Sequence, residues 1–247
     1  MFQSKKNIIA GRKPVITAIT EGKGVDKILL ARQASGEEVT QLKTLARTHQ
    51  IPLQLVPAEK LNSLTNINHQ GVVAYKAAIQ YHDVQQVIDH LNAQGQVPLF
   101  LLLDGITDVR NIGAIARSAV ACGAQAIIIP DKGVAALGED ALKASAGALE
   151  LIHICRVNSL MKTVDLLHLN GIAVYASQMQ ANTLLFNLPL QQPCALVLGS
   201  EGRGITPALA RICDEAFKIP MPGGFESLNV SVAAGMMLYE AMKQRLL

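Results

Sequence analysis

Three segments in the C-terminal part of the chain carry residues whose types and spacing suit them to chemistry. The first, GITDVRNIGAIARSAVACGA, places Asn111 near the start of an expected helix and Arg117 six positions later. Small residues three or four positions from the arginine predict a close approach to that helix face, namely Gly113, Ala114 and Ala121. An amide and a guanidinium suit the binding of a polar substrate. The alternative is an exposed arginine on a helix that Asp108 or Asn111 caps.

The second segment, VLGSEGRGITPALA, runs from a buried strand through a glycine-rich turn into a helix with Thr206 as its cap. The glycines allow a backbone to approach a ligand at low steric cost. The segment has neither the GxGxxG spacing of a dinucleotide-binding fold nor the GK[ST] ending of a P-loop. It is therefore a binding loop of another kind, in which Glu201 is either a polar contact or a charged turn residue.

The third segment, IPMPGGFESLNVS, turns at its proline and glycines and enters the terminal helix, for which Ser227 is the expected cap. Ser227, Asn229 and Ser231 crowd the helix start, where free backbone N–H groups also gather. Capping accounts for one of these three polar residues and leaves two for other tasks.

The terminal helix itself is apolar on nearly every side. One stripe contains Val230, Ala233, Ala234, Met237, Leu238 and Ala241. We expect such a helix to be buried at both domain and subunit contacts, because its small residues allow close packing.

The elements that position these segments form the pattern of a parallel sheet. The run VPLFLLLD is apolar almost throughout, as in a strand that is buried on both faces. Further strand-like runs, AIIIP, LIHICRV, IAVYA, CALVLG and AFKIPM, alternate with helical stretches, which predicts helices on both faces. Ligands of such sheets bind beyond the carboxyl ends of the strands, so the loops after LLLD, VLGS and IPMP are the expected site.

The chain before this sheet is expected to form a small α/β domain over residues 1–76, with a linker over 77–97 and the sheet domain over 98–247. The GRKP start and the NINHQG stretch are expected loops whose side chains meet phosphate or ribose, or are simply solvated. The candidate contacts there are Arg12, Lys13, His69 and Gln70.

Composition limits the class of protein without naming it. Of 247 residues, 50% are hydrophobic and 17% charged, which favours a globular, cytoplasmic protein with no membrane span or signal peptide. The formal charge of +3 suits RNA and ordinary enzymes alike. The cysteines lie far apart without a CxxC pair, so we expect buried hydrophobic residues and no metal site at Cys122, Cys155, Cys194 and Cys213.

Taken in order, NIGAIARSA, LVLGSEGRG and IPMPGGFESLNVSVAAG resemble the three motifs of the SpoU (TrmH-type) branch of the SPOUT methyltransferases. The resemblance covers about residues 98–247, and the joint order of the motifs makes it more specific than one glycine loop. The first 75 residues resemble the small RNA-binding domain of the subgroup that methylates a guanosine of 23S rRNA, through IIAGRKPVITAI and NHQGVVA.

This resemblance implies an S-adenosylmethionine-dependent RNA 2′-O-ribose methyltransferase that is a homodimer and has a deep trefoil knot in its C-terminal domain. The cofactor contacts that it implies, mostly through backbone, are Gly199, Ile219, Met221 and Leu228. The polar active-site set that it implies is Asn111, Arg117, Glu201, Ser227 and Asn229. Ser200 departs from the pattern, because many relatives carry asparagine there.

The reaction requires the 2′-hydroxyl to be aligned with the methyl donor and its developing negative charge to be stabilised. Arg117 suits that second task, because a guanidinium stays protonated and is a poor base. Asn111 and Glu201 are expected to position Arg117 and the ribose, while Ser227 and Asn229 secure the cofactor loop or the nucleotide. The proton acceptor stays open.

Three other interpretations remain at this point. A tRNA ribose methylase shares the same catalytic segments, and the N-terminal domain is what favours rRNA. A non-catalytic RNA-binding relative that acts in ribosome assembly has the same fold. A small-molecule enzyme with a nucleotide cofactor lacks the expected Rossmann or P-loop signature.

Overall fold

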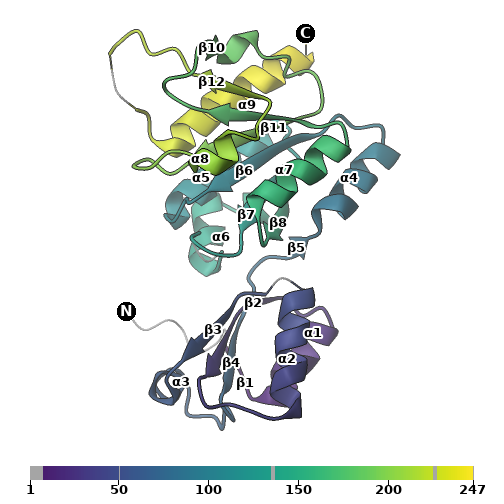
Figure 1. Ribbon diagram of the computed structural model, residues 1–247, viewed down its shortest axis with the longest axis vertical. Helices are drawn as coiled ribbons and strands as arrows, with labels where there is room; N and C mark the ends of the chain where they lie inside the picture. The colour runs from purple at the N-terminus through teal and green to yellow at the C-terminus, as the bar shows by residue number, and fades with distance from the viewer. Residues whose placement is uncertain (1–7, 50, 135–136, 225–226, 247) are drawn as a thin grey trace. The chain divides into compact units, whose positions relative to one another are not determined.

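The computed structural model describes residues 8–49, 51–134, 137–224 and 227–246. The chain divides into two compact units, Met1–Gln80 and Tyr81–Leu247 (Figure 1). The first seven residues of the expected N-terminal domain lie outside the described residues, as do Phe225 and Glu226 of the third segment.

The first unit is a four-stranded sheet in the order β1-β4-β2-β3, with one parallel pair, β2 with β3. Its strands are β1 (Ile8–Ala10), β2 (Val25–Ala31), β3 (Leu53–Val56) and β4 (Val72–Lys76). Its helices are α1 (Arg12–Thr20), α2 (Glu37–Thr48) and α3 (Ala58–Leu64).

Strand β2 shows how this unit packs on both faces. Ile28 and Leu30 turn toward α1 and α2, whereas Leu29 and Ala31 turn toward Leu61 of α3. Successive residues of a strand face opposite sides, so the apolar run ILLA at the end of β2 implies that both faces of the sheet are covered. The first unit is therefore a three-layer α/β fold of its own.

The expected loop at GRKP is wrong for three of its residues. Arg12, Lys13 and Pro14 form the first turn of helix α1. Gly11 precedes the helix with a φ of 104°, which glycine adopts easily. A proline in a first turn breaks no internal hydrogen bond, since those N–H groups have no partner within the helix.

The second unit contains an eight-stranded sheet in the order β10-β12-β9-β11-β6-β7-β8-β5, and every neighbouring pair is parallel. The strands are β5 (Tyr81–His82), β6 (Leu99–Asp104), β7 (Ala126–Pro130), β8 (His153–Val157), β9 (Ala173–Ser177), β10 (Thr183–Leu184), β11 (Cys194–Gly199) and β12 (Glu215–Lys218). The predicted parallel sheet is confirmed, and β7 and β11 have the same bounds as the runs AIIIP and CALVLG.

Helices cover both faces of this sheet (Figure 1). The longer ones are α4 (Val84–Ala93), α5 (Val109–Ala121), α6 (Glu139–Ser145), α7 (Leu160–Leu169), α8 (Pro207–Ala210) and α9 (Val230–Leu246), and two short 3-10 turns are η2 (Ala148–Glu150) and η3 (Leu185–Asn187). Helices α4, α7 and α8 share one core with Phe100 and Leu102 of β6. Leu101 and Leu103 turn to the opposite face, and α6 and α9 both pack against α5.

Much of the expected linker, residues 77–97, belongs to the second unit. Strand β5 pairs with β8, and Val87 and Ile88 of α4 are buried in the core beneath the sheet. The amphipathic stretch VQQVIDHL therefore serves as a covering helix, and burial of its apolar side holds it in place. In the described residues, no helix combines the length and apolar character that crossing a membrane demands.

Candidate functional site

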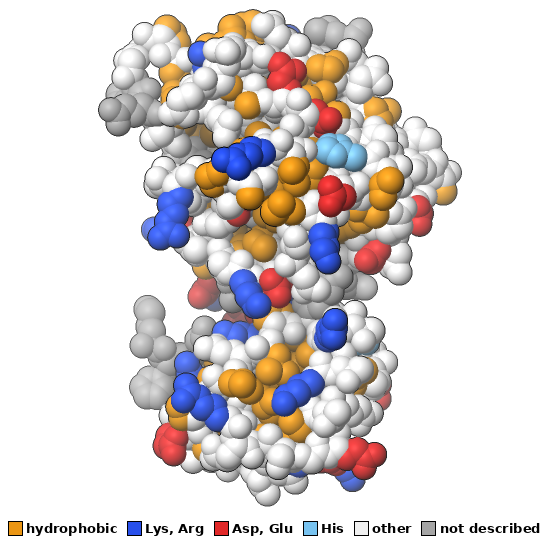
Figure 2. Space-filling model, viewed as in Figure 1, with side chains coloured by type: hydrophobic (Ala, Val, Ile, Leu, Met, Phe, Trp, Pro, Cys, Tyr) orange, Lys and Arg blue, Asp and Glu red, His pale blue; other side chains and the backbone are white. Residues whose placement is uncertain are grey.

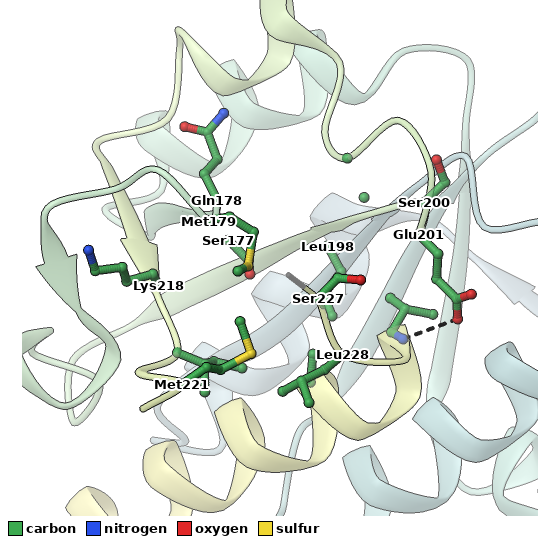
Figure 3. A pocket seen from close by; sticks show the side chains of 15 residues that line it. Ser177, Gln178, Met179, Leu198, Ser200, Glu201, Lys218, Met221, Ser227 and Leu228 are labelled. Atoms are coloured by element: carbon green, nitrogen blue, oxygen red, sulfur yellow. Dashed lines mark hydrogen bonds between the residues drawn. The ribbon is translucent and has the colours of Figure 1, made fainter. Parts of the chain in front are cut away.

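A hollow of about 660 Å³, part of it open to solvent, lies where the carboxyl ends of β9, β11 and β12 meet (Figure 3). These strands are neighbours in the sheet, so the loops that follow them converge. The hollow is lined by Ser177, Gln178, Met179, Leu198, Gly199, Ser200, Glu201, Gly204, Lys218, Ile219, Met221, Ser227, Leu228, Val230 and Ala233. Its walls combine apolar side chains with a few polar groups, as is typical of small-molecule sites.

The turn after β11 folds back so tightly that it requires glycine. A Cβ atom on Gly199 would lie 2.0 Å from the carbonyl carbon of Gly204 and 2.2 Å from the nitrogen of Ile205. The N–H of Gly204 donates to the oxygen of Ser200 at 2.8 Å and closes the turn. The hydroxyl of Ser200 accepts from the N–H of Arg203 at 3.4 Å. Ser200 therefore accepts a hydrogen bond from the backbone of the turn, as an asparagine side chain at this position can also do.

A cluster of one carboxylate and two amides lies at the edge of the hollow. Oε1 of Glu201 accepts from Nδ2 of Asn229 at 2.7 Å and from Nδ2 of Asn111 at 3.2 Å. It also accepts from the N–H of Val230 at 3.3 Å, which is drawn in Figure 3. Nδ2 of Asn229 also donates to Oδ1 of Asn111 at 3.1 Å. The structure thus unites one residue from each of the three segments singled out in the sequence.

The sheet register explains why residues so far apart in the chain meet. Asp104 at the end of β6 pairs with Gly199 at the end of β11, so the loops that follow lie side by side. Oδ2 of Asp104 accepts from the N–H of Thr206 at 2.7 Å and fastens the two loops together. Asp108, not Asn111, caps α5 by accepting from the N–H of Arg110, which leaves the amide of Asn111 available to the cluster.

Helix α9 begins at Val230, and its cap differs from the expected one. Oδ1 of Asn229 accepts from the N–H of Ser231 at 3.0 Å, so Asn229 serves as the cap and Ser227 does not. An asparagine in that position is as good a cap as serine. Ser227 lies instead among the residues that line the hollow (Figure 3).

Arg117 lies apart from this cluster within one chain. It is exposed, and its side chain makes no hydrogen bond or ion pair with any residue that the structure describes. It lies six helical positions after Asn111, which corresponds to about 9 Å along the helix axis and about 120° around it. The close approach predicted near Arg117 is real and comes from α6, since a Cβ on Gly113 would lie 2.7 Å from the backbone of Ala144.

The four expected cofactor contacts, Gly199, Ile219, Met221 and Leu228, all line the hollow. Sequence reasoning missed Ser177, Gln178 and Met179, which end β9 and follow it. The missing signal is strand order, because only the position of β9 between β12 and β11 brings this loop to the site.

In the first unit, two of the four candidate RNA contacts are already engaged. Nε of Arg12 donates to the oxygen of Gln70 at 3.1 Å. One ring nitrogen of His69 lies 2.8 Å from Oδ1 of Asn62, and the other accepts from the N–H of Gly71 at 3.0 Å. These bonds shape the loop, whereas Lys13 is exposed and Gln70 holds a left-handed φ of 48°.

The thiols are unsuited to chemistry at neutral pH. Burial raises the pKa of Cys155 to about 12 and that of Cys213 to about 11. Cys155 and Cys194 are buried, but Cys122 and Cys213 are only half-buried, so the expectation of four buried cysteines holds for two. Among the described residues, no group of three or more His, Cys, Asp or Glu side chains is arranged to hold a metal ion.

Two families match nearly all of this architecture. Residues 98–239 match the SpoU rRNA Methylase family, and residues 8–82 match the family described as RNA 2′-O ribose methyltransferase substrate binding. The first match covers the parallel sheet and the three segments of the site. The second covers the four-stranded unit.

Relatives extend the likeness over the whole chain. A putative TrmH family tRNA/rRNA methyltransferase of Staphylococcus saprophyticus is 35% identical over 238 residues, or 96% of each chain. The putative TrmH family tRNA/rRNA methyltransferase YacO of Bacillus subtilis is 35% identical and covers 99% of this chain and 98% of its own. The SpoU methyltransferase AviRb of Streptomyces viridochromogenes, solved in complex with AdoMet, is 26% identical, with a TM-score of 0.61 over 97% of this chain and 90% of its own.

Proposed function

The chain belongs to the SpoU/TrmH family of RNA methyltransferases, and on that premise we propose that it methylates the ribose 2′-hydroxyl of a guanosine in 23S rRNA, with S-adenosylmethionine as donor. The observation that carries this proposal is the adjacency of the glycine-walled hollow and the Glu201 cluster. In this proposal the hollow holds the methyl donor, and the Glu201 cluster binds the ribose that accepts the methyl group. A methyl transfer needs both within reach of each other.

The residues that line the hollow suit S-adenosylmethionine in their chemistry. Leu198, Met221 and Leu228 offer apolar contact to a purine ring, and Gly199 also lines the hollow (Figure 3). When bound, this molecule supplies an electrophilic methyl group. We propose that Gly199, Ile219, Met221 and Leu228 hold it, mostly through backbone, and that Ser227 secures the loop over it. We also propose that the chain around the hollow forms the trefoil knot.

The polar cluster is proposed to position the ribose. Asn111 and Asn229 present amide groups at a solvent-accessible edge, and Glu201 fixes both by accepting their N–H groups. A 2′-hydroxyl held there is oriented before reaction, which removes much of the entropic cost of the encounter. As the new C–O bond forms, the donor's C–S bond to the methyl group would break and the hydroxyl proton would pass to water at this solvent-accessible edge. In our proposal the chain orients the hydroxyl and stabilises the negative charge that develops on its oxygen.

We propose that the protein acts as a homodimer in which Arg117 meets the ribose or its phosphate at the subunit interface. The face of α9 turned away from the core exposes Val232, Met236 and Tyr239, at 48%, 46% and 59%, with helical spacing. Gly235 of the same helix packs toward Ser118, the neighbour of Arg117. An apolar stripe of this kind supports a subunit contact, and we propose that the exposed arginine reaches the partner's site across it.

A mixing experiment tests this arrangement. Asn111→Ala and Arg117→Ala homodimers are each expected to lose methyl transfer at least about a hundredfold, since each lacks a group that acts on the reacting oxygen. If Arg117 serves the partner's site, dimers exchanged between the two variants regain one intact site and measurable activity. Failure to regain activity, although native mass spectrometry shows that the two variants have formed mixed dimers, contradicts the shared site.

The choice of RNA rests on the first unit. Its match to a substrate-binding family supports a dedicated RNA contact, and Figure 2 shows Lys and Arg side chains on the visible face of each unit. We favour 23S rRNA because the first unit resembles the rRNA-binding domain of that subgroup. A tRNA substrate is the alternative, because the relatives from Staphylococcus saprophyticus and Bacillus subtilis are named putative tRNA/rRNA methyltransferases.

The function is tested with transcribed 23S rRNA fragments and tRNA, with methyl transfer and cofactor binding measured on wild type and on the Asn111→Ala and Arg117→Ala variants. We expect both variants to bind S-adenosylmethionine within about threefold of wild type while transfer falls. Full transfer in both variants would overturn the residue assignment. Absence of calorimetric S-adenosylmethionine binding in wild type would instead favour a non-catalytic RNA-binding protein. Mapping of ribose methylation in cells that lack the protein identifies the nucleotide.

A further inference from the structure

Arg203 lies on the same tight turn as Glu201, and its charge is not compensated by the chain. Its side chain is exposed and has no hydrogen bond or ion pair with a residue in the described part of the protein. The bridge between Ser200 and Gly204 fixes the turn, and the hydroxyl of Ser200 accepts from the N–H of Arg203. The backbone of Arg203 is therefore held in a constant position relative to the Glu201 cluster.

The neighbouring arginine on the other side of the cluster differs in this respect. Arg110 directly precedes Asn111, and its Nη2 lies 2.7 Å from Oδ2 of Asp108 while Nε lies 3.2 Å from both carboxylate oxygens. This forked contact satisfies the guanidinium geometrically and offsets its charge. Of these two arginines beside the cluster, Arg203 is the one whose guanidinium is free to bind an anion.

A ribose of RNA that binds at the cluster is accompanied by negatively charged phosphate groups. Each ribose in RNA is joined to phosphate groups on both sides, and a phosphate that approaches the Glu201 carboxylate is repelled unless a cation lies nearby. A guanidinium binds phosphate through two parallel N–H groups and keeps its charge at any physiological pH. We propose that Arg203 binds an RNA backbone phosphate next to the ribose that is methylated. This proposal rests on the proposed function and adds a substrate contact to it.

The position of Arg203 also separates RNA binding from cofactor binding. Ser200, Glu201 and Gly204 line the hollow, whereas Gly202 and Arg203 between them do not. The tip of the turn therefore lies outside the lining of the hollow that is proposed to hold the methyl donor. A change of side chain at Arg203 alters the RNA contact and leaves the walls of the hollow as they are.

The test compares Arg203→Ala, Arg203→Lys and Arg211→Ala with wild type on transcribed 23S rRNA and on tRNA. Arg211 is an equally exposed arginine at the end of α8, outside the lining of the hollow, and serves as the matched control. Dissociation constants measured at several salt concentrations give the number of phosphate contacts, and calorimetry gives S-adenosylmethionine binding.

For Arg203→Ala we expect RNA binding and kcat/KM to fall about tenfold or more, and the slope of log Kd against log salt to fall by roughly 0.7 to 0.9, as for one lost phosphate contact. Arg203→Lys is expected to keep the slope, because it keeps the charge. A slope for Arg203→Ala equal to that of Arg211→Ala overturns the proposal, as does a loss of S-adenosylmethionine binding in Arg203→Ala. If wild type methylates neither RNA, it is the proposed function that fails, and this contact fails with it.

Discussion

Replacement of Gly199 by alanine tests whether the tight turn after β11 builds the hollow. The added Cβ would lie 2.0 Å from the carbonyl carbon and 2.2 Å from the oxygen of Gly204, both backbone atoms. Contacts of Cβ atoms below 3.0 Å essentially never occur, so the turn must move by about 1 Å or more. Overpacking of this kind costs about 1–3 kcal/mol. In a domain of this size that lowers Tm by roughly 2–12 °C.

The same displacement moves a wall of the hollow, so we expect S-adenosylmethionine binding by Gly199→Ala to weaken at least about tenfold, as measured by calorimetry. Gly202→Ala is the matched control, because it lies on the same turn and its Cβ would meet no atom within 4 Å. That variant is expected to melt and to bind like wild type. If Gly199→Ala also binds and melts like wild type, the close crossing at Gly204 does not shape the hollow and our reasoning fails.

Three further predictions concern other parts of the chain. Arg245 donates to the carbonyl oxygens of four residues before β6 and β11, so Arg245→Ala is expected to lower the free energy of unfolding by about 2–4 kcal/mol in denaturant titrations. Burial raises the pKa of Cys155 and Cys213, so an unfolded chain releases these protons at lower pH than the folded chain does. The stability that this difference contributes is therefore retained below about pH 9 and is lost as the pH rises toward 11 to 12. Thermal melts over this pH range measure the loss. In RNA-binding titrations Lys13→Ala is expected to lower the salt slope by roughly 0.7 to 0.9, whereas His69→Ala is expected to lower the Tm of the first unit.

Much of the fold was accessible from sequence because its signals are local. The runs AIIIP and CALVLG are apolar without interruption and are followed by polar residues, Asp131 and Ser200, so β7 and β11 follow from them directly. The glycine turn and the polar residues around Asn229 also stood out, because nothing in a purely structural turn or cap requires so many of them. These features depend only on residues near one another in the chain.

The remaining features depend on tertiary contacts that no local pattern encodes. The loop after β9 reaches the hollow only because β9 lies between β12 and β11. Helix α4 has the pattern of an amphipathic helix, but the sequence does not indicate that its Ile88 packs in the core of the second unit and not of the first. Likewise, the sequence puts Asn111 and Arg117 on one helix, but the groups that each side chain meets depend on the loops that pack beside α5.

The bonds that hold the polar cluster join residues separated by 90 positions for Asn111 with Glu201 and by 118 for Asn111 with Asn229, and the contact of Asp104 with Thr206 spans 102. Pairings of such long range form slowly, because the chain loses its freedom before the contacts compensate for that loss. Asn229 directly precedes α9 and bonds both Glu201 and Asn111, so the undocking of α9 would remove one of the three members of the cluster. The appearance of donor binding during refolding should therefore coincide with the last cooperative step, which makes that binding a reporter of complete folding.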